Sequence, residues 1–211
     1  MIRLHGMRIT VLCLLFLAAV PMGAHAQSGP GPIEVPGIYV NAASGMTFPP
    51  AVGEFKRSGI YRFDRDERDV GVDYNHLTES SGIAASVYIY PAPPLPADAR
   101  SAEARAAACQ GELDRRKREV YSYYPDAVLI AERDVTLPQG GKSYPGKLAT
   151  FEFEAPFRGE RQALHSELYI FCYAAESWAF EYRFTAPKTF DYAGPIAAFM
   201  RALPWTLRAG G

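Results

Sequence analysis

The sequence contains few metal- and haem-ligating side chains and almost no excess charge of either sign. Its 211 residues include three cysteines and four histidines, and after residue 26 only Cys109, Cys172, His76 and His165 remain. This scarcity argues against a zinc or haem centre, so no cofactor and no metal are expected. The formal net charge of -1 predicts no overall attraction to nucleic acid, which is therefore not an expected partner.

Motifs for nucleophilic catalysis and phosphate binding are also missing. No G-x-S-x-G occurs, which excludes the nucleophile elbow of the α/β-hydrolases. Residues 80–82 (SSG) are interpreted as a turn before a strand. Residues 140–143 (GGKS) are similar to the end of a P-loop, but no helical pattern follows them, so they are interpreted as a β-turn. The chain is therefore not expected to be an enzyme.

The sequence begins with the pattern of a targeting segment. Arg3 and Arg8 precede an apolar run at residues 9–20 that is too short to span a bilayer, and residues 24–26 (AHA) have small side chains at the first and third positions. This pattern predicts a secretory signal peptide over residues 1–26. We therefore expect a periplasmic or secreted protein that does not span the membrane after signal cleavage.

The remaining chain has the length of one domain, preceded by a short leader. Residues 27–37 are rich in glycine and proline and predict a flexible leader. Residues 38–211 are expected to form a single domain. Apolar segments with turn residues between them predict strands at residues 54–63, 70–75, 83–90, 128–137, 147–154, 164–173 and 178–184.

The apolar period changes between residues 98 and 124, where one long helix is predicted. Ser101 is expected to cap its start and Pro125 to end it. The charged run at residues 114–119 is expected to face water. A second helix is predicted near the C-terminus, at residues 192–202.

The order of these elements predicts the fold class. Strands joined by tight turns must be antiparallel. We expect an α+β fold, with an antiparallel sheet of about six to seven strands and both helices packed on one face. The predicted core consists of Val70, Val72, Val87, Ile89, Leu113, Phe151, Phe153, Leu168, Ile170, Phe180, Tyr182 and Ile196.

Three features of this pattern resemble the PsbP/DcrB-like fold. They are the FPPAVGEF segment at residues 48–55, the long helix after a proline cluster, and the SWAFEYRF strand at residues 177–184. The closer likeness is to uncharacterised secreted proteobacterial proteins of that type. The resemblance implies a binding or accessory protein, and it carries over no functional residue.

Charged residues alternate with apolar ones on three consecutive predicted strands. They are Glu152 and Glu154 on the first strand, His165 and Glu167 on the second, and Glu181 and Arg183 on the third. If the strands are neighbours in register, these side chains gather on one sheet face, where they suit cation binding or acid–base chemistry. The alternative is a solvated face with cross-strand ion pairs.

Tyrosines cluster near the end of the long helix, at Tyr121, Tyr123 and Tyr124. Tyrosine offers a large contact area with a polar tip, which suits an interface with a partner. The alternative is a set of half-buried rings between the sheet edge and solvent.

Cys109 and Cys172 are predicted to form a disulfide. An oxidising compartment favours the pairing of two cysteines, and both share an element face with apolar residues. A helix usually lies about 10 Å above its sheet, whereas a disulfide needs Cα atoms about 4.4–6.8 Å apart. Two buried thiols are therefore the alternative.

Three functions remain as hypotheses. The first is a secreted, non-catalytic periplasmic protein that binds an unknown partner protein or envelope component. The second is a small-molecule or lipid carrier with a pocket between the sheet and the helices, which requires a volume above about 300 Å³. The third is a hydrolase or metal-dependent enzyme that uses Glu152, Glu167 and His165.

Overall fold

The computed structural model describes residues 30–79, 81–96 and 101–208. The predicted signal peptide and the first residues of the predicted leader lie outside these ranges. The two helices are α1 (Ala102–Tyr123) and α2 (Ala193–Ala202). The strands are β1 (Gly31–Pro32), β2 (Tyr39–Val40), β3 (Thr47–Phe48), β4 (Ala51–Val52), β5 (Phe55–Arg62), β6 (Val70–Leu77), β7 (Gly82–Pro91), β8 (Val128–Gln139), β9 (Lys142–Phe157), β10 (Glu160–Ala174) and β11 (Trp178–Pro187).

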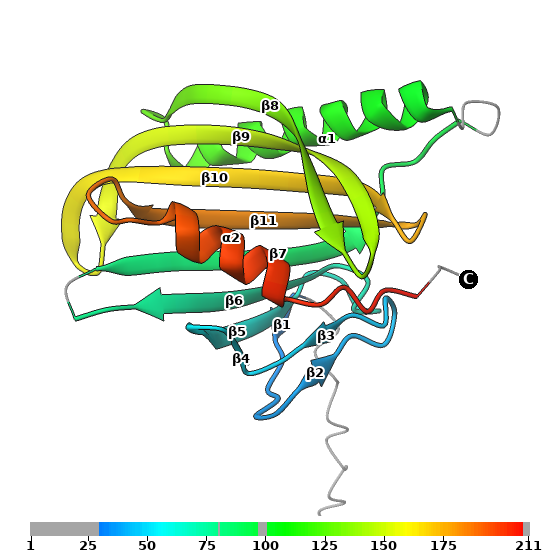
Figure 1. The fold of residues 1–211 in the computed structure, drawn as a ribbon, viewed down its shortest axis with the longest axis horizontal. Helices are drawn as coiled ribbons and strands as arrows, with labels where there is room; N and C mark the ends of the chain where they lie inside the picture. The colour runs from blue at the N-terminus through cyan, green and yellow to red at the C-terminus, as the bar shows by residue number, and fades with distance from the viewer. Residues whose placement is uncertain (1–29, 80, 97–100, 209–211) are drawn as a thin grey trace, which may run out of the picture.

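One long antiparallel sheet organises the described chain (Figure 1). Its order is β1-β5-β6-β7-β11-β10-β9-β8, and β4 also pairs with β5, so it has nine strands. The α+β class is confirmed, but the sheet has more strands than predicted. The additional strands, β1 and β4, are each two residues long, and such short segments carry no measurable alternation of apolar and polar residues.

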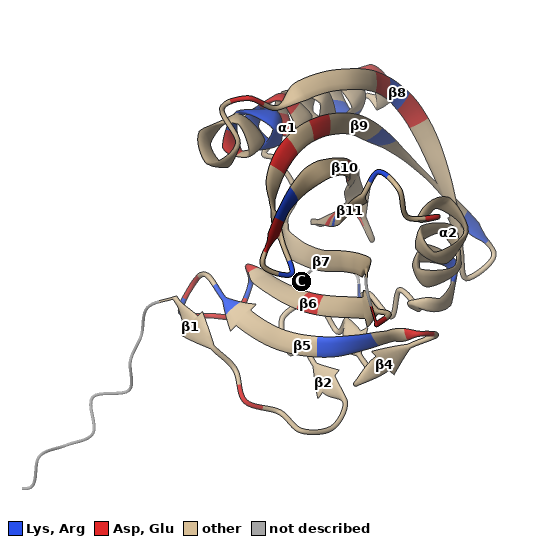
Figure 2. Ribbon diagram, turned by 90° about the vertical axis from the view of Figure 1, so that its left-hand side faces the viewer, with Lys and Arg blue, Asp and Glu red and all other residues tan. Residues whose placement is uncertain are grey.

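The sheet curls, and the two helices lie on opposite faces of it (Figure 2). α1 covers the outer face of β9 and β10, whereas α2 lies inside the curl. The prediction that both helices share one face is therefore wrong. The reason is that β10 is apolar on both sides: Leu168 and Ile170 pack in the cluster under α1, whereas Phe171 packs in the cluster under α2. Each face of β10 therefore packs in a cluster under a different helix.

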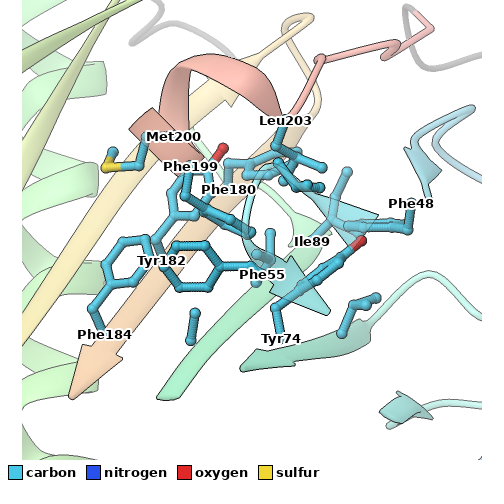
Figure 3. Packing of buried hydrophobic residues seen from close by; sticks show 14 of the residues in the cluster. Phe48, Phe55, Tyr74, Ile89, Phe180, Tyr182, Phe184, Phe199, Met200 and Leu203 are labelled. Carbon is cyan, nitrogen blue, oxygen red and sulfur yellow. The ribbon is translucent and has the colours of Figure 1, made fainter. Parts of the chain in front are cut away.

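All twelve residues of the predicted core are buried. They divide between the two clusters rather than forming one. The inner cluster is the larger and is dominated by aromatic rings from β5, β6, β11 and α2 (Figure 3). Phe199 of α2 lies among them, 4.6 Å from the ring of Phe55 and 5.3 Å from that of Tyr74.

Part of the predicted leader is attached to the sheet. Gly31 and Pro32 pair with the end of β5, and the next residue donates its backbone N–H to the carbonyl of Ile60 at 2.9 Å. The Arg57 guanidinium donates to the carbonyl oxygens of Val35 and Gly37, each at 2.6 Å. The flexible leader predicted over residues 27–37 is thus anchored from residue 31 onward.

Candidate functional site

The residues of the predicted acidic face separate onto the two sides of the sheet. His165 is opposite Glu152 in the register of β9 and β10, and both lie on the inner face. Glu181 is opposite Ile170 of the outer cluster, so Glu181 and its neighbour Arg183 face α1 instead. The three strands are neighbours, as the hypothesis required, but the side chains do not gather on one face.

On the inner face, the histidine and one glutamate form a small hydrogen-bonded group. Glu167 accepts a hydrogen bond from the Tyr169 hydroxyl at 2.8 Å and lies 3.2 Å from His165 Nε2. The imidazole of His165 stacks on Tyr192, with 4.1 Å between ring centroids. Glu152 is instead paired with Lys188 at 2.7 Å. Within the described residues, no group of three or more histidine, cysteine, aspartate and glutamate side chains is arranged to hold a metal ion.

On the outer face, Glu181 is the centre of an ionic cluster between β11 and α1. Its carboxylate is fully buried, and it accepts hydrogen bonds from the Tyr90 hydroxyl and the Arg116 guanidinium, each at 3.0 Å, and from Arg183. Arg183 also donates to Glu119 at 2.7 Å. Arg116 and Glu119 belong to the charged run that was expected to face water, and they face the sheet instead. Each buried charge has an opposite partner, so the cluster fixes α1 in position.

The arginines of the cluster lower the pKa of two carboxylates, Glu119 and Glu112. Burial raises the pKa of Glu119, but the hydrogen bond from Arg183 and the positive charge of Arg116 outweigh it, so the pKa lies below its usual value. Glu112 behaves in the same way beside Arg115 and Arg116. The chemistry of the cluster is that of a structural ion-pair network rather than of a proton-transfer site.

The other residues considered for catalysis lie in turns or among aromatic rings. His76 packs against two phenylalanine rings. Ser81 lies in the turn before β7, and Ser80 lies outside the described residues. Gly140 and Gly141 have φ values of 55° and 78° and form the two-residue turn between β8 and β9, as interpreted from the sequence.

The predicted disulfide is present between Cys109 of α1 and Cys172 of β10, with Cα atoms 5.7 Å apart. Ala102 and Ala106 on this part of α1 are exposed. The disulfide lines a surface pocket of about 440 Å³ beside the β8–β9 hairpin. It ties the helix covalently to the outer face.

A cluster of exposed apolar side chains lies where α1 ends and β8 begins. We call it the edge patch, and its members are Tyr121, Tyr123, Tyr124, Val128, Leu129 and Ile130. Tyr124 stacks on Phe153, and Tyr121 packs edge-on against Phe151, the residue opposite Leu129 in β9. The predicted tyrosine cluster is therefore continuous with Leu129, whereas Val128 is opposite Glu152 and lies on the inner face. All three apolar residues at 128–130 belong to β8, which is at one end of the strand order.

The inner face carries a groove of about 640 Å³ between β8, β10 and α2. Its walls include the apolar Val135, Ile196 and Met200 and the carboxylates of Asp134 and Glu167. Arg133 and Arg201, which are exposed, also line it. The second hypothesis from the sequence requires a pocket between the sheet and the helices, but the sequence did not indicate its place, which depends on α2 facing β8. Its volume falls within the range typical of small-molecule sites.

No protein-family model, curated protein or solved structure matches this chain. The resemblance to the PsbP/DcrB-like fold therefore stays a prediction. Neither helix in the described ranges is both long and apolar enough to span a membrane.

Proposed function

We propose that this chain is a secreted, non-catalytic protein of the bacterial periplasm that binds a partner protein through the edge patch. The observation that carries the proposal is the exposure of three consecutive apolar residues, Val128, Leu129 and Ile130, on an outermost strand. Exposed apolar patches at a sheet edge are sites of association, because the strand offers both apolar side chains and unpaired backbone groups.

The partner expected at this surface is an extended apolar segment of another protein. Such a segment adds a strand to β8, with backbone hydrogen bonds supplying affinity and the side chains of the edge patch supplying specificity. Tyr123 is 75% exposed and Tyr124 39% exposed, so their rings are available to cover the added strand. A β-bulge at Ile130 interrupts the pairing of β8 with β9 and makes this end of the strand distinct from the rest.

Two further observations support the compartment and the class. The Cys109–Cys172 disulfide suits an oxidising compartment. The class rests on the resemblance of the sequence to the PsbP/DcrB-like fold, which implies a binding or accessory role.

The test uses substitutions that add a charge to the edge patch. Peptides selected from a displayed library against the mature protein are expected to be rich in β-branched and aromatic residues. Their affinity should fall at least about tenfold for Ile130→Lys, since a buried lysine loses more than about 1.4 kcal/mol of binding energy. Ile38→Lys is the matched control, because Ile38 is similarly exposed (60% against 52% for Ile130) and lies outside the edge patch.

Two outcomes would contradict the proposal. Peptides that bind both variants equally would place the interaction elsewhere on the molecule. Sedimentation that shows a dimer of the mature protein, dissociated by Ile130→Lys, would mean that a second copy of this chain covers the edge patch instead of a partner protein.

A further inference from the structure

The groove beside α2 combines an apolar surface with two arginines that form no ion pair within the described ranges of the chain. Arg133 on β8 and Arg201 on α2 make no hydrogen bond or ion pair with any other described side chain. Arg133 is opposite Leu148 in the register, and Leu148 is opposite Tyr169, so Arg133 points over the inner face toward Tyr169. Two free guanidinium groups on opposite walls favour an anionic group between them.

The negative charges near the groove already have partners. Glu167 is held by the Tyr169 hydroxyl and lies within hydrogen-bond distance of His165. Asp134 is paired with Lys147 at 2.6 Å. Both carboxylates line the groove, but neither forms an ion pair with Arg133 or Arg201.

The apolar part of the groove is formed by side chains from both walls. Val135 lies next to Arg133 on the same side of β8, and Ile196, Ala197 and Met200 lie along α2. Ile196 and Met200 are buried in the inner cluster, so this wall is rigid and continuous with the core. An aliphatic chain laid across the half-buried Val135 and Ala197, above Ile196 and Met200, removes its own apolar surface and theirs from water.

We propose that this groove binds a single-chain anionic amphiphile, such as a long-chain carboxylate, as a free monomer. The anionic head lies between Arg133 and Arg201, and the chain lies over Val135, Ile196 and Met200. This site is separate from the edge patch, which lies at the other end of β8 and on its outer edge. The protein can therefore hold a ligand while its edge is occupied.

The experiment is a calorimetric titration of the mature protein with dodecanoate below its micelle concentration. We expect saturable binding that weakens about tenfold in Arg133→Gln and in Arg201→Gln, which is the effect of losing one charge-assisted hydrogen bond. Arg118→Gln is the control, because it removes the same charge from an exposed position on α1. Ala197→Trp, which fills the groove, should abolish binding.

Comparison ligands separate the anionic head from the chain. Dodecanol and dodecyltrimethylammonium should bind more weakly than dodecanoate, and vesicles of phosphatidylglycerol should not retain the protein. Equal dodecanoate affinity in the Arg133, Arg201 and Arg118 variants would overturn the proposal. So would absence of binding to the mature protein, equal affinity for dodecanol, or binding to vesicles alone. Because both arginines are exposed, their variants remain informative even if Ala197→Trp does not fold.

Discussion

Along its 22 residues, α1 on the outer face buries Cys109, Leu113 and Val120, whereas α2 on the inner face buries as many side chains within ten residues. α1 is attached through directional bonds, namely a disulfide and a cluster of ion pairs. α2 is attached by the packing of Phe199 and its neighbours among aromatic rings. A long polar helix can thus be fixed to a sheet when covalent and ionic contacts replace apolar area, but its stability then depends on redox state and pH.

The largest effect is expected from opening the aromatic inner cluster. Phe199→Ala should lower the free energy of unfolding by about 4–5 kcal/mol, because the surrounding rings cannot collapse into the cavity. Phe153→Ala on the outer face should cost about 3 kcal/mol, since Phe153 stacks on the exposed Tyr124, which can move. Urea unfolding measures both values, and a larger loss for Phe153→Ala would reverse the comparison.

Removal of the disulfide should come next and should act on α1. The double variant Cys109→Ala and Cys172→Ala opens a loop with a sequence separation of 63 residues. For a loop of this size the chain-entropy relation gives about 4 kcal/mol. The unfolding midpoint in denaturant should fall, and dithiothreitol should lower it in the wild type but not in the variant. Coincident curves for the oxidised and reduced wild type would contradict this.

Neutralising the centre of the ionic cluster should have a smaller but clear effect. Glu181→Gln leaves Arg116 and Arg183 without their shared buried carboxylate, which should cost about 3 kcal/mol. Glu154→Gln is a suitable control, because its pair with Arg161 is exposed and should contribute less than about 1 kcal/mol. Similar losses for the two variants would show that the cluster does not hold α1.

The smallest expected effect is a loss of folding stability at acid pH that arises from carboxylates on the outer face. The pKa values of Glu112 and Glu119 lie below their usual value of 4.5 in the folded protein. The stability they contribute is therefore complete above that pH and is lost as the pH falls through their folded values. Burial raises the pKa of Asp69, which acts in the opposite direction and offsets part of the loss.

A double variant isolates this contribution. Glu112→Gln with Glu119→Gln should flatten the fall in unfolding free energy between roughly pH 5 and pH 3 relative to the wild type. Thermal unfolding followed across this range measures it. An unchanged slope would assign the acid sensitivity to other carboxylates.

The long helix and the seven main strands follow from local patterns, and the structure contains all of them. The sequence does not predict which side of α1 faces the sheet, because residues 114–119 have the local pattern of a segment exposed to water. Arg116 and Glu119 are directed inward only because β11 presents Glu181, which is distant in the sequence. A charged residue that is buried by a partner distant in the sequence has the same local sequence pattern as a charged residue exposed to water.

The candidate sites show the same limit. The tyrosines were singled out from their sequence, whereas residues 128–130 were predicted only to begin a strand over residues 128–137. They are exposed because β8 lies outermost in the sheet, and strand order is set by long-range pairing. The groove depends likewise on the contact of β8 with α2, which no periodicity in either element reveals.

The pairing of β7 with β11 affects how the chain folds. These strands lie side by side (Figure 1), and the Tyr90–Glu181 contact across them joins residues 91 positions apart. The strands on either side of the β7–β11 pair are connected mainly by hairpins, which form quickly. Contacts between residues that are far apart in the sequence form slowly. We expect the pairing of β7 with β11 to form last. Both cysteines lie C-terminal to β7. The disulfide can therefore link α1 to β10 in a sheet of β8 to β11, before β11 has paired with β7. The newly synthesised chain therefore passes through an interval in which it has a second unpaired sheet edge, and β7 of its own N-terminal half later pairs with that edge.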